Sequence, residues 1–357
     1  MKQEIIPVLK KLISFPTTDG NKQAFIELFE YVKSLIPEGF YTKEYEFQEK
    51  PVLVIANTED IDLDFVFCTH VDVVPCSKYE LTEDGNILHG RGTFDMKGGV
   101  TAALLAFLHT KTDQKTAIFL TSDEETGGNC VKELLEIYHP KFAIIPDGGN
   151  HFQLVEEEKG RLLVKLSITT KAAHAAEVFK GQNAITTLFD LYQKLLEKYP
   201  LPESEEQFQT SICLSMIQGG TAYNQVPDYA EMVFDIRHIA KDQKEQILKD
   251  IADLDPNLKI EVLAKETAYE TDIKDPRVQE YLEICKQVLH KEIPIIKANA
   301  TSDGIYFTEH HIPTALMNPE GGFPHAENEF VTKDSLEQLY EIYCQYLKKE
   351  GNKNETK

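Results

Sequence analysis

The side chains best suited to chemistry in this chain are one histidine and three carboxylates. His70 and the pair Glu124 and Glu125 each follow a short apolar run, and Asp95 lies alone in a stretch rich in glycine. Imidazole and carboxylate groups are ligands that divalent metal ions prefer in proteins. Glycine allows the backbone to turn tightly and to approach another group closely. The pattern therefore predicts a divalent-metal site in which Asp95 lies between two ions.

The apolar runs that precede these residues predict buried strands. Residues 65–68 and 117–120 are continuous apolar runs of strand length. Strand and helix patterns alternate through the first part of the chain, with strands near 41–47, 52–56, 64–69, 117–121 and 142–145 and helices near 22–36, 100–109 and 130–138. This alternation predicts an α/β fold with a mixed, mostly parallel sheet that carries helices on both faces. Ligands and catalytic groups gather at the carboxyl ends of the strands in such sheets.

The pattern changes in residues 161–266, which predict a second domain. Strand and helix patterns follow in the order β-α-β-β-α-β, at 161–170, 183–197, 211–218, 229–237, 241–253 and 258–264. This order is typical of a ferredoxin-like α+β domain. A second domain is also expected from size, because single cores stop growing near ~250–300 residues and the chain has 357. We therefore expect a discontinuous domain of residues 1–160 and 267–357 with an insertion between its two parts.

The composition limits the partners and the compartment. The formal net charge of -22 argues against nucleic acid and anionic membranes as partners. No apolar stretch approaches the ~20 residues of a membrane span, and residues 1–4 lead into an amphipathic helix pattern rather than a signal peptide. The six cysteines show no paired spacing, so we interpret them as small buried hydrophobic residues. We expect a cytoplasmic protein.

Five motifs follow one another along the chain. They are His-Val-Asp at 70–72, the glycine-rich run at 90–99, Asp-Glu-Glu at 123–125, Asp-Gly-Gly at 147–149 and His-Ala-Glu-Asn-Glu at 325–329. In this order, and over nearly the whole chain, the sequence resembles the co-catalytic zinc amidohydrolase and exopeptidase family. That family includes acetylornithine deacetylase, succinyl-diaminopimelate desuccinylase and carboxypeptidase G-like metallopeptidases. The resemblance implies a zinc-exopeptidase-like fold whose inserted domain serves as a lid and dimerisation unit.

The resemblance assigns five metal ligands. His70 and Asp147 would hold one ion, and Glu125 and His325 would hold the other. Asp95 would bridge the two ions. The implied cofactor is a pair of divalent ions, with zinc preferred and cobalt or manganese as alternatives. Two such ions lower the pKa of a shared water toward ~7.

Three further acidic residues receive supporting roles, those of Glu124 and Asp72 from the same resemblance and that of Glu329 from the chemistry of metal-bound histidines. Glu124 would be the general base, because a base must lie close to the reacting water without binding the metal itself. Asp72 would fix the ring of His70. Glu329 would do the same for His325, since a metal-bound histidine needs its second ring nitrogen held.

Substrate contacts are implied in both domains. His174 matches a histidine that, in dimeric relatives, reaches the active site of the other chain and polarises the scissile carbonyl. Asn224 and Arg237 match contacts to a substrate carboxylate, which a bidentate guanidinium suits, although Arg237 would equally suit an ion pair on its strand. Gly321 and Gly322 would expose backbone N–H groups to the substrate or would be plain turn residues.

The implied reaction is hydrolysis of an amide bond in a small carboxylate-bearing substrate, foremost the deacylation of an N-acyl amino acid, by a homodimer formed through the inserted domain. A metallo-exopeptidase acting on short peptides is the alternative, and a non-catalytic relative that binds metal or a small molecule is a third hypothesis. Desuccinylases carry an arginine where this chain has Ile305, which disfavours a succinyl-diaminopimelate substrate. A glycosidase with a carboxylate pair would leave the histidines unexplained.

Overall fold

The computed structural model describes residues 2–204 and 206–349, and the chain folds into two compact units. Unit 1 comprises Met1–Glu156, Thr271–Ile296 and Ser302–Lys357, and unit 2 comprises Glu157–Glu270 and Lys297–Thr301. Unit 2 thus lies between two parts of unit 1 in the sequence and also takes in a short later segment. None of the helices in the described ranges is long and apolar enough to cross a membrane.

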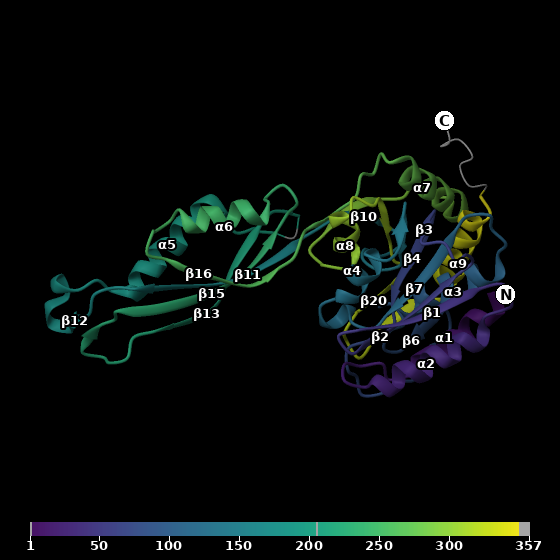
Figure 1. The fold of residues 1–357 in the computed structure, drawn as a ribbon, viewed down its shortest axis with the longest axis horizontal. Coiled ribbons are helices and arrows are strands. Elements are labelled where there is room, and N and C mark those ends of the chain that lie inside the picture. Colours follow the sequence, from purple (N-terminus) through teal and green to yellow (C-terminus); the bar gives the residue numbers. More distant parts are fainter. Residues whose placement is uncertain (1, 205, 350–357) are drawn as a thin grey trace. The chain divides into compact units, whose positions relative to one another are not determined.

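The main sheet of unit 1 has parallel strands at its centre. Its order is β1 (Tyr41–Phe47), β2 (Lys50–Ala56), β7 (Thr116–Thr121), β4 (Phe65–His70), β9 (Ala143–Ile145), β19 (Thr314–Leu316), β10 (Leu154–Glu158) and β17 (Tyr269–Glu270) (Figure 1). Strand β18 (Ile295–Ala298) also pairs with β10. Strand β4 runs parallel to β7 and β9, and β9 runs parallel to β19. The outer strands β1, β2 and β10 pair antiparallel. The predicted α/β fold with a mixed sheet is confirmed, with the parallel pairing confined to the centre.

Helices cover both faces of this sheet because successive strand residues point to opposite sides. Phe65 and Phe67 belong to one hydrophobic core together with residues of α1 (Ile5–Ile13), α2 (Lys22–Leu35), α3 (Lys97–His109), α7 (Pro276–Leu289) and α9 (Lys333–Leu347). Helix α4 (Asn129–Leu135) contacts β7. Phe119 of β7 packs on Tyr138, which follows α4, with ring centroids 5.4 Å apart. Burying an aromatic side chain of this kind stabilises the folded state by about 1.5–3 kcal/mol relative to leaving it exposed.

Two glycines explain how α3 packs so closely on the loops around it. A Cβ atom at Gly98 would lie 2.2 Å from the carbonyl oxygen of Thr93, and one at Gly99 would lie 2.5 Å from the side chain of Pro146. Any larger residue at either position would push these loops away. The loops carry Asp95 and Asp147, so the paired glycines of the motif set the distance between two predicted metal ligands.

A smaller four-stranded sheet in unit 1 holds the loop that carries His325. Its order is β20 (Gly321–Gly322), β21 (Phe330–Thr332), β6 (Ile87–His89) and β5 (Thr82–Asp84). The loop between β20 and β21 contains His325, whose backbone has a φ of 64°. The remaining short elements are η1 (Lys2–Glu4), β3 (Asp62–Leu63), η2 (Glu124–Thr126), β8 (His139–Pro140) and α8 (Gly304–Glu309).

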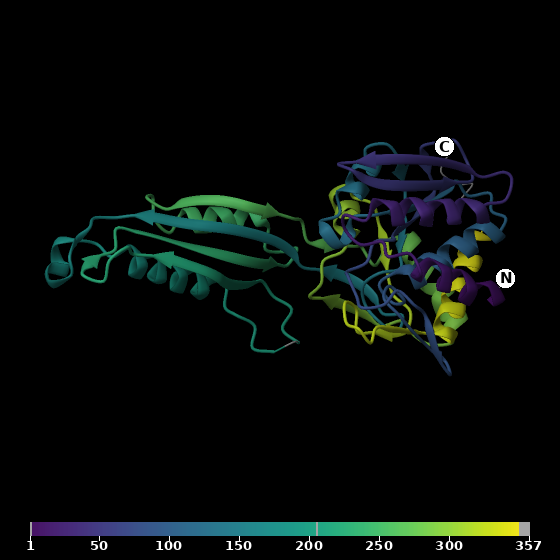
Figure 2. The same ribbon diagram turned by 90° about the horizontal axis from the view of Figure 1, so that it is seen from below.

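Unit 2 is built on a separate antiparallel sheet, as the sequence predicts. The strand order is β13 (Ser211–Gly219), β15 (Tyr229–His238), β11 (Gly160–Thr169) and β16 (Lys259–Lys265), and the strands run side by side (Figure 2). Helices α5 (Ala184–Lys198) and α6 (Lys244–Ala252) pack on one face, where even-numbered residues of β11 and β15 form the core (Figure 1). A short ladder joins β12 (Ala173–His174) to β14 (Gln225–Val226), and η3 (Ala175–Lys180) follows β12.

Candidate metal centre

Five side chains of unit 1 form two overlapping groups that could each hold a metal ion. His70, Asp95 and Asp147 offer ligand atoms that all lie within 4.8 Å of one another, and Asp95, Glu125 and His325 form the second such group. His70 Nε2 lies 3.2 Å from Asp95 Oδ1, and His325 Nε2 lies 3.2 Å from Asp95 Oδ2. Each oxygen of the shared carboxylate therefore faces a different histidine, which is the arrangement that a bridging carboxylate requires.

The central strands of the sheet position three of these ligands. His70 is the last residue of β4, Glu125 lies in the turn that follows β7, and Asp147 lies just after β9. These three strands are parallel neighbours in the order β7, β4, β9, so their carboxyl ends meet at one edge of the sheet. The ligands that are distant in sequence meet there because the parallel strands bring them to the same edge.

The donor set fits a pair of divalent cations. The buried Nε2 atom of His70 has no hydrogen-bond partner among the described residues. Burial and the nearby Asp95 carboxylate raise the pKa of Glu125 to about 7 and that of Asp147 to about 6. Three carboxylates packed this closely repel one another unless positive charge is added. Imidazole and carboxylate donors in this arrangement are the ligands that zinc and similar ions take.

Asp72 links two of the candidate ligands. The Nδ1 atom of His70 lies 3.1 Å from the backbone carbonyl oxygen of Asp72 and 3.3 Å from its carboxylate. The other carboxylate oxygen of Asp72 accepts a hydrogen bond of 2.9 Å from the backbone N–H of Glu125. Burial lowers the pKa of His70, but the carboxylates of Asp72 and Asp95 outweigh burial and raise it well above its usual value. Asp72 thus holds the ring of His70 with Nε2 toward Asp95.

Glu124 precedes the candidate ligand Glu125 in the chain, but no neighbouring side chain or backbone group fixes the carboxylate of Glu124 in the described residues. Within the described part of the chain, the Glu124 side chain has no hydrogen bond or ion pair. Burial, followed by the carboxylates of Asp303 and Asp147, raises the pKa of Glu124 well above its usual value. A carboxylate with a raised pKa that is free to accept a proton is suited to general base catalysis.

Glu329 holds the loop of Asp95 rather than the ring of His325, so the predicted role of Glu329 is corrected. One carboxylate oxygen of Glu329 accepts hydrogen bonds from the backbone N–H groups of Phe94 at 2.9 Å and Asp95 at 3.1 Å. The other oxygen accepts one from the backbone N–H of Gly92 at 2.9 Å. Its carboxylate is therefore occupied by backbone donors of the loop. The spacing of four residues from His325 could not reveal this, because the donors lie more than 230 positions away in sequence.

Arg91 ties the two ligand-bearing loops together, a role that sequence reasoning missed. Its guanidinium is buried and donates one hydrogen bond to Glu329 and another to the backbone carbonyl of His325, both at 2.8 Å. A buried guanidinium in two such bonds fixes the geometry of its partners. Glu327 connects this loop to a second segment, because its carboxylate accepts hydrogen bonds from the backbone N–H and the hydroxyl of Ser77. The loop of His325 is thus anchored from both sides.

The residues predicted to contact substrate in the inserted domain fall into two places within unit 2. His174 is exposed at the end of β12, and its Nδ1 accepts a hydrogen bond of 3.1 Å from the backbone N–H of Ala176. The carbonyl oxygen of Asn224 accepts a hydrogen bond from the next residue after His174, so these two residues lie together. Arg237 lies near the C-terminal end of β15, far along that strand from His174 and Asn224. Its Nε is 2.8 Å from the carboxylate of Asp235.

Packing and hydrogen bonding within the protein account for Gly321. The side-chain amide of Asn150 donates to the carbonyl of Gly321 at 2.8 Å and accepts from its N–H at 3.1 Å. The backbone N–H of Gly321 therefore already donates a hydrogen bond within the protein. A Cβ atom at Gly321 would lie 2.3 Å from the ring of Phe94, so only glycine fits there. Gly322 pairs with Phe330 in the small sheet.

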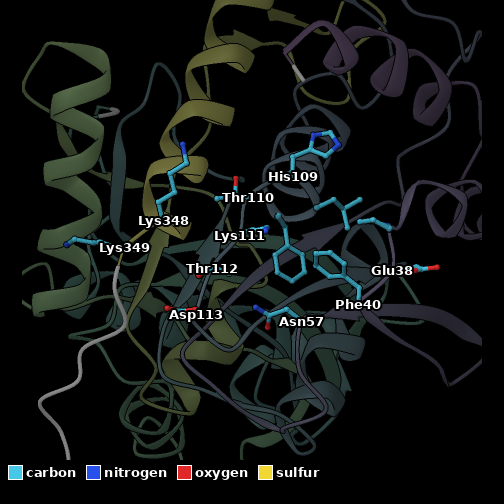
Figure 3. A pocket seen from close by; sticks show the side chains of 13 residues that line it. Glu38, Phe40, Asn57, His109, Thr110, Lys111, Thr112, Asp113, Lys348 and Lys349 are labelled. Atoms are coloured by element: carbon cyan, nitrogen blue, oxygen red, sulfur yellow. The ribbon is translucent and has the colours of Figure 1, made fainter.

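A separate hollow of about 700 Å³ lies in unit 1 (Figure 3). Phe40 and Phe107 form its apolar part, with ring centroids 5.1 Å apart. Among the basic side chains around it, Lys349 pairs with Glu280. None of the five candidate ligands lines this hollow, so it is separate from the candidate metal centre.

The sequence profile described as peptidase family M20/M25/M40 matches residues 66–349. The chain belongs to this family. The resemblance inferred from the five motifs is therefore confirmed, and the protein is an M20 metallohydrolase that acts on amide or peptide bonds.

Proteins similar to this chain are named for different activities. The chain is 28% identical over 389 residues to succinyl-diaminopimelate desuccinylase from Helicobacter pylori, covering 96% of this chain and 98% of the relative. It is 24% identical to a probable carboxypeptidase from Aspergillus clavatus, covering 95% of this chain and 87% of that one. Its fold matches that of aminopeptidase PepT from Bacillus cereus with a TM-score of 0.78 at 18% identity, covering 97% and 98% of the two chains.

Proposed function

We propose that this M20 chain is a two-zinc amide hydrolase that removes the acyl group from a small N-acyl amino acid. The observation that carries the proposal is the position of Asp95 between two groups of imidazole and carboxylate ligands, with the unheld carboxylate of Glu124 beside the ligand Glu125. His70 and Asp147 would hold one ion, Glu125 and His325 would hold the other, and Asp95 would bridge them. Cobalt or manganese could replace zinc in this donor set.

The residues of the chain supply the proton transfers and the positioning. When bound, the metal pair would lower the pKa of a water molecule and polarise the scissile carbonyl. Glu124 accepts the proton of the attacking water and donates it to the leaving amine nitrogen. Asp72, Arg91 and Glu329 hold the ligand-bearing segments so that no rearrangement is needed during the reaction.

A metallo-exopeptidase acting on short peptides is the second candidate function. It is favoured by the probable carboxypeptidase among the relatives, since the same chemistry cleaves an amide in either substrate. Ile305, buried in α8, stands where desuccinylases carry an arginine, which argues against a succinyl substrate despite the relative from Helicobacter pylori. The third hypothesis, a non-catalytic binding protein, is set aside because the chain is an M20 metallohydrolase.

We also propose that the protein is a homodimer formed through unit 2, with His174 acting on the active site of the other chain. Tyr229 and Arg237 lie eight residues apart on β15, about 26 Å, because a strand rises by about 3.3 Å per residue. His174 and Asn224 lie near the start of β15 and Arg237 near its end, too far apart to contact one small substrate from the same unit 2. Exposed apolar side chains near His174 support an interface, among them Phe179 and Tyr223.

The experiment that tests this function is amide hydrolysis by the purified chain reconstituted with zinc or cobalt. The substrates are N-acetylornithine, N-succinyl-diaminopimelate, other N-acyl amino acids and a set of dipeptides, each with and without a chelator. Chelator-sensitive release of the acyl group supports the deacylase, and release of an amino acid from dipeptides alone supports the exopeptidase. Failure to bind stoichiometric metal contradicts both.

A further inference from the structure

The turn that carries the candidate ligand His325 also carries an exposed aromatic side chain. Phe323 lies two residues before His325 and is 57% exposed. The backbone N–H of Ala326 donates a hydrogen bond of 3.1 Å to the carbonyl of Phe323, which closes a four-residue turn. Pro324 in the second position and a φ of 64° at His325 in the third are the pattern of a type II turn. Because two residues of chain span at most about 7 Å, Phe323 and His325 lie close together.

Phe323 is an unfavourable residue for its position on two independent grounds. Its backbone has a φ of 56°, a left-handed conformation in which a bulky side chain is strained and glycine is not. Its ring is also open to water, although burial of an apolar side chain is what stabilises a fold. Neither the backbone conformation nor the exposure favours phenylalanine here, so its presence indicates a use for the ring.

The ring of Phe323 is supported by the small sheet and by the anchored turn. Its centroid lies 5.9 Å from that of Phe330 in β21, and the ring of Phe330 lies 6.1 Å from that of His89 in β6. Arg91 holds the same turn through its hydrogen bond of 2.8 Å to the carbonyl of His325. The side chain of His325 is 55% exposed. An apolar ring and a candidate metal ligand are therefore both open to a molecule that approaches this turn.

We propose that Phe323 is a specificity residue that contacts an apolar acyl group of the substrate. This assignment rests on the proposed function, and it names the kind of acyl group that the deacylase prefers. The amino-acid part of such a substrate carries a charged carboxylate, which gains nothing from an aromatic ring. An uncharged alkyl or aryl acyl group gains affinity from the same contact, because both surfaces leave water. Phe323, Phe330 and His325 all belong to unit 1, so the contact needs no residue of unit 2.

Isothermal titration calorimetry with the full-length, zinc-loaded protein tests the proposal without requiring turnover. The probes are acetohydroxamate and hexanohydroxamate, which share a metal-binding head and differ by four CH2 groups. Burying one CH2 group changes affinity about fourfold, so we expect the wild type to bind hexanohydroxamate at least tenfold more tightly than acetohydroxamate. Phe323→Ala should reduce this ratio below threefold and leave the affinity for acetohydroxamate within threefold of wild type. Phe323→Leu keeps an apolar side chain and should keep the ratio above fivefold.

The control Tyr41→Ala removes an exposed ring from β1 of the same unit and should keep the wild-type ratio. Elemental analysis should find the wild-type zinc content in Phe323→Ala, because Phe323 is not a ligand. Phe323→Gly should melt at a higher temperature than Phe323→Ala, because only glycine adopts a φ of 56° without strain. An unchanged ratio in Phe323→Ala overturns the proposal. An equal loss of affinity for both probes, or a loss of zinc, also overturns it, because either result would show a structural ring.

Turnover distinguishes this proposal from the proposed function. On the acetyl and hexanoyl derivatives of one amino acid, the wild type should have at least tenfold higher kcat/KM for the hexanoyl derivative, and Phe323→Ala less than threefold. A wild type that cleaves dipeptides alone refutes the proposed deacylase and the acyl contact with it. A deacylase that shows no preference for the hexanoyl derivative refutes only the role of Phe323.

Discussion

The carboxylate of Glu329 accepts a hydrogen bond of 3.1 Å from the backbone N–H of Asp95, although the two residues lie 234 positions apart in the sequence. Asp95 is the ligand shared by both candidate metal positions. The place of this shared ligand therefore depends on a residue that belongs to neither candidate ligand group. Because Glu329 also pairs with Arg91, the same carboxylate connects the loop of Asp95 to the loop of His325.

Replacing Glu329 with glutamine should weaken metal binding and destabilise the fold. The amide NH2 group would face backbone N–H donors, and Arg91 would lose its charged partner in a buried position. We expect metal affinity to fall about 10- to 100-fold, and the free energy of unfolding to fall by about 3–5 kcal/mol. Cobalt absorption titrations and urea denaturation measure the two effects. Glu283→Gln, on the exposed side of α7, is the matched control, and equal metal affinity in both variants would refute the positioning role.

Replacing Glu124 with glutamine should abolish turnover without releasing metal. The variant keeps the size of the side chain but cannot accept a proton, so kcat should fall by a factor of about 10² to 10⁴. Metal content measured by elemental analysis should stay at the wild-type value, because Glu124 belongs to neither ligand group. Glu133→Gln, on the exposed face of the neighbouring α4, should keep full activity. Loss of metal in Glu124→Gln would instead make this residue a ligand.

The local sequence pattern predicts a metal site at His70, Asp95 and Glu125, and the family resemblance adds Asp147 and His325 to the candidate ligands. An apolar run ends two residues before His70, and glycines flank the loop of Asp95, so the strand exits and tight loops are visible in short stretches. The partners of Glu329 could not be predicted, since they depend on which loop the sheet places beside it.

Metal affinity should rise with pH between about 5 and 8. In the metal-free protein, burial and Asp95 raise the pKa of Glu125 to about 7 and that of Asp147 to about 6, so both carboxyls are largely protonated at pH 5. A metal ion must displace these protons at low pH and few of them at pH 8. Calorimetry in buffers of different ionisation enthalpy should show more protons released at pH 6 than at pH 8.

The stability of the metal-free protein should change with pH in the opposite direction. A carboxyl whose pKa is raised by folding stabilises the fold while it is protonated, and this stabilisation is lost as the pH rises through the folded value. Glu125 and Asp147 therefore make the metal-free fold less stable at pH 8 than at pH 5. Added zinc should reverse the trend, because an ion present at 100 times its Kd stabilises the fold by about 2.7 kcal/mol. Affinity and melting temperature that do not vary with pH would contradict the assignment of these two ligands.

Mixing two inactive variants should restore activity if His174 serves the active site of the other chain. Glu124→Gln removes the base, and His174→Ala removes the group proposed to polarise the scissile carbonyl, so each homodimer should be nearly inactive. In a mixed dimer that exchanges His174 across a two-fold interface, one of the two sites contains both an intact Glu124 and an intact His174. An equimolar mixture forms mixed dimers in half of the pairs, so about a quarter of the wild-type activity should return. Size-exclusion chromatography with light scattering checks that the variants remain dimeric. Dimers that exchange subunits without regaining activity would place His174 outside the partner's site.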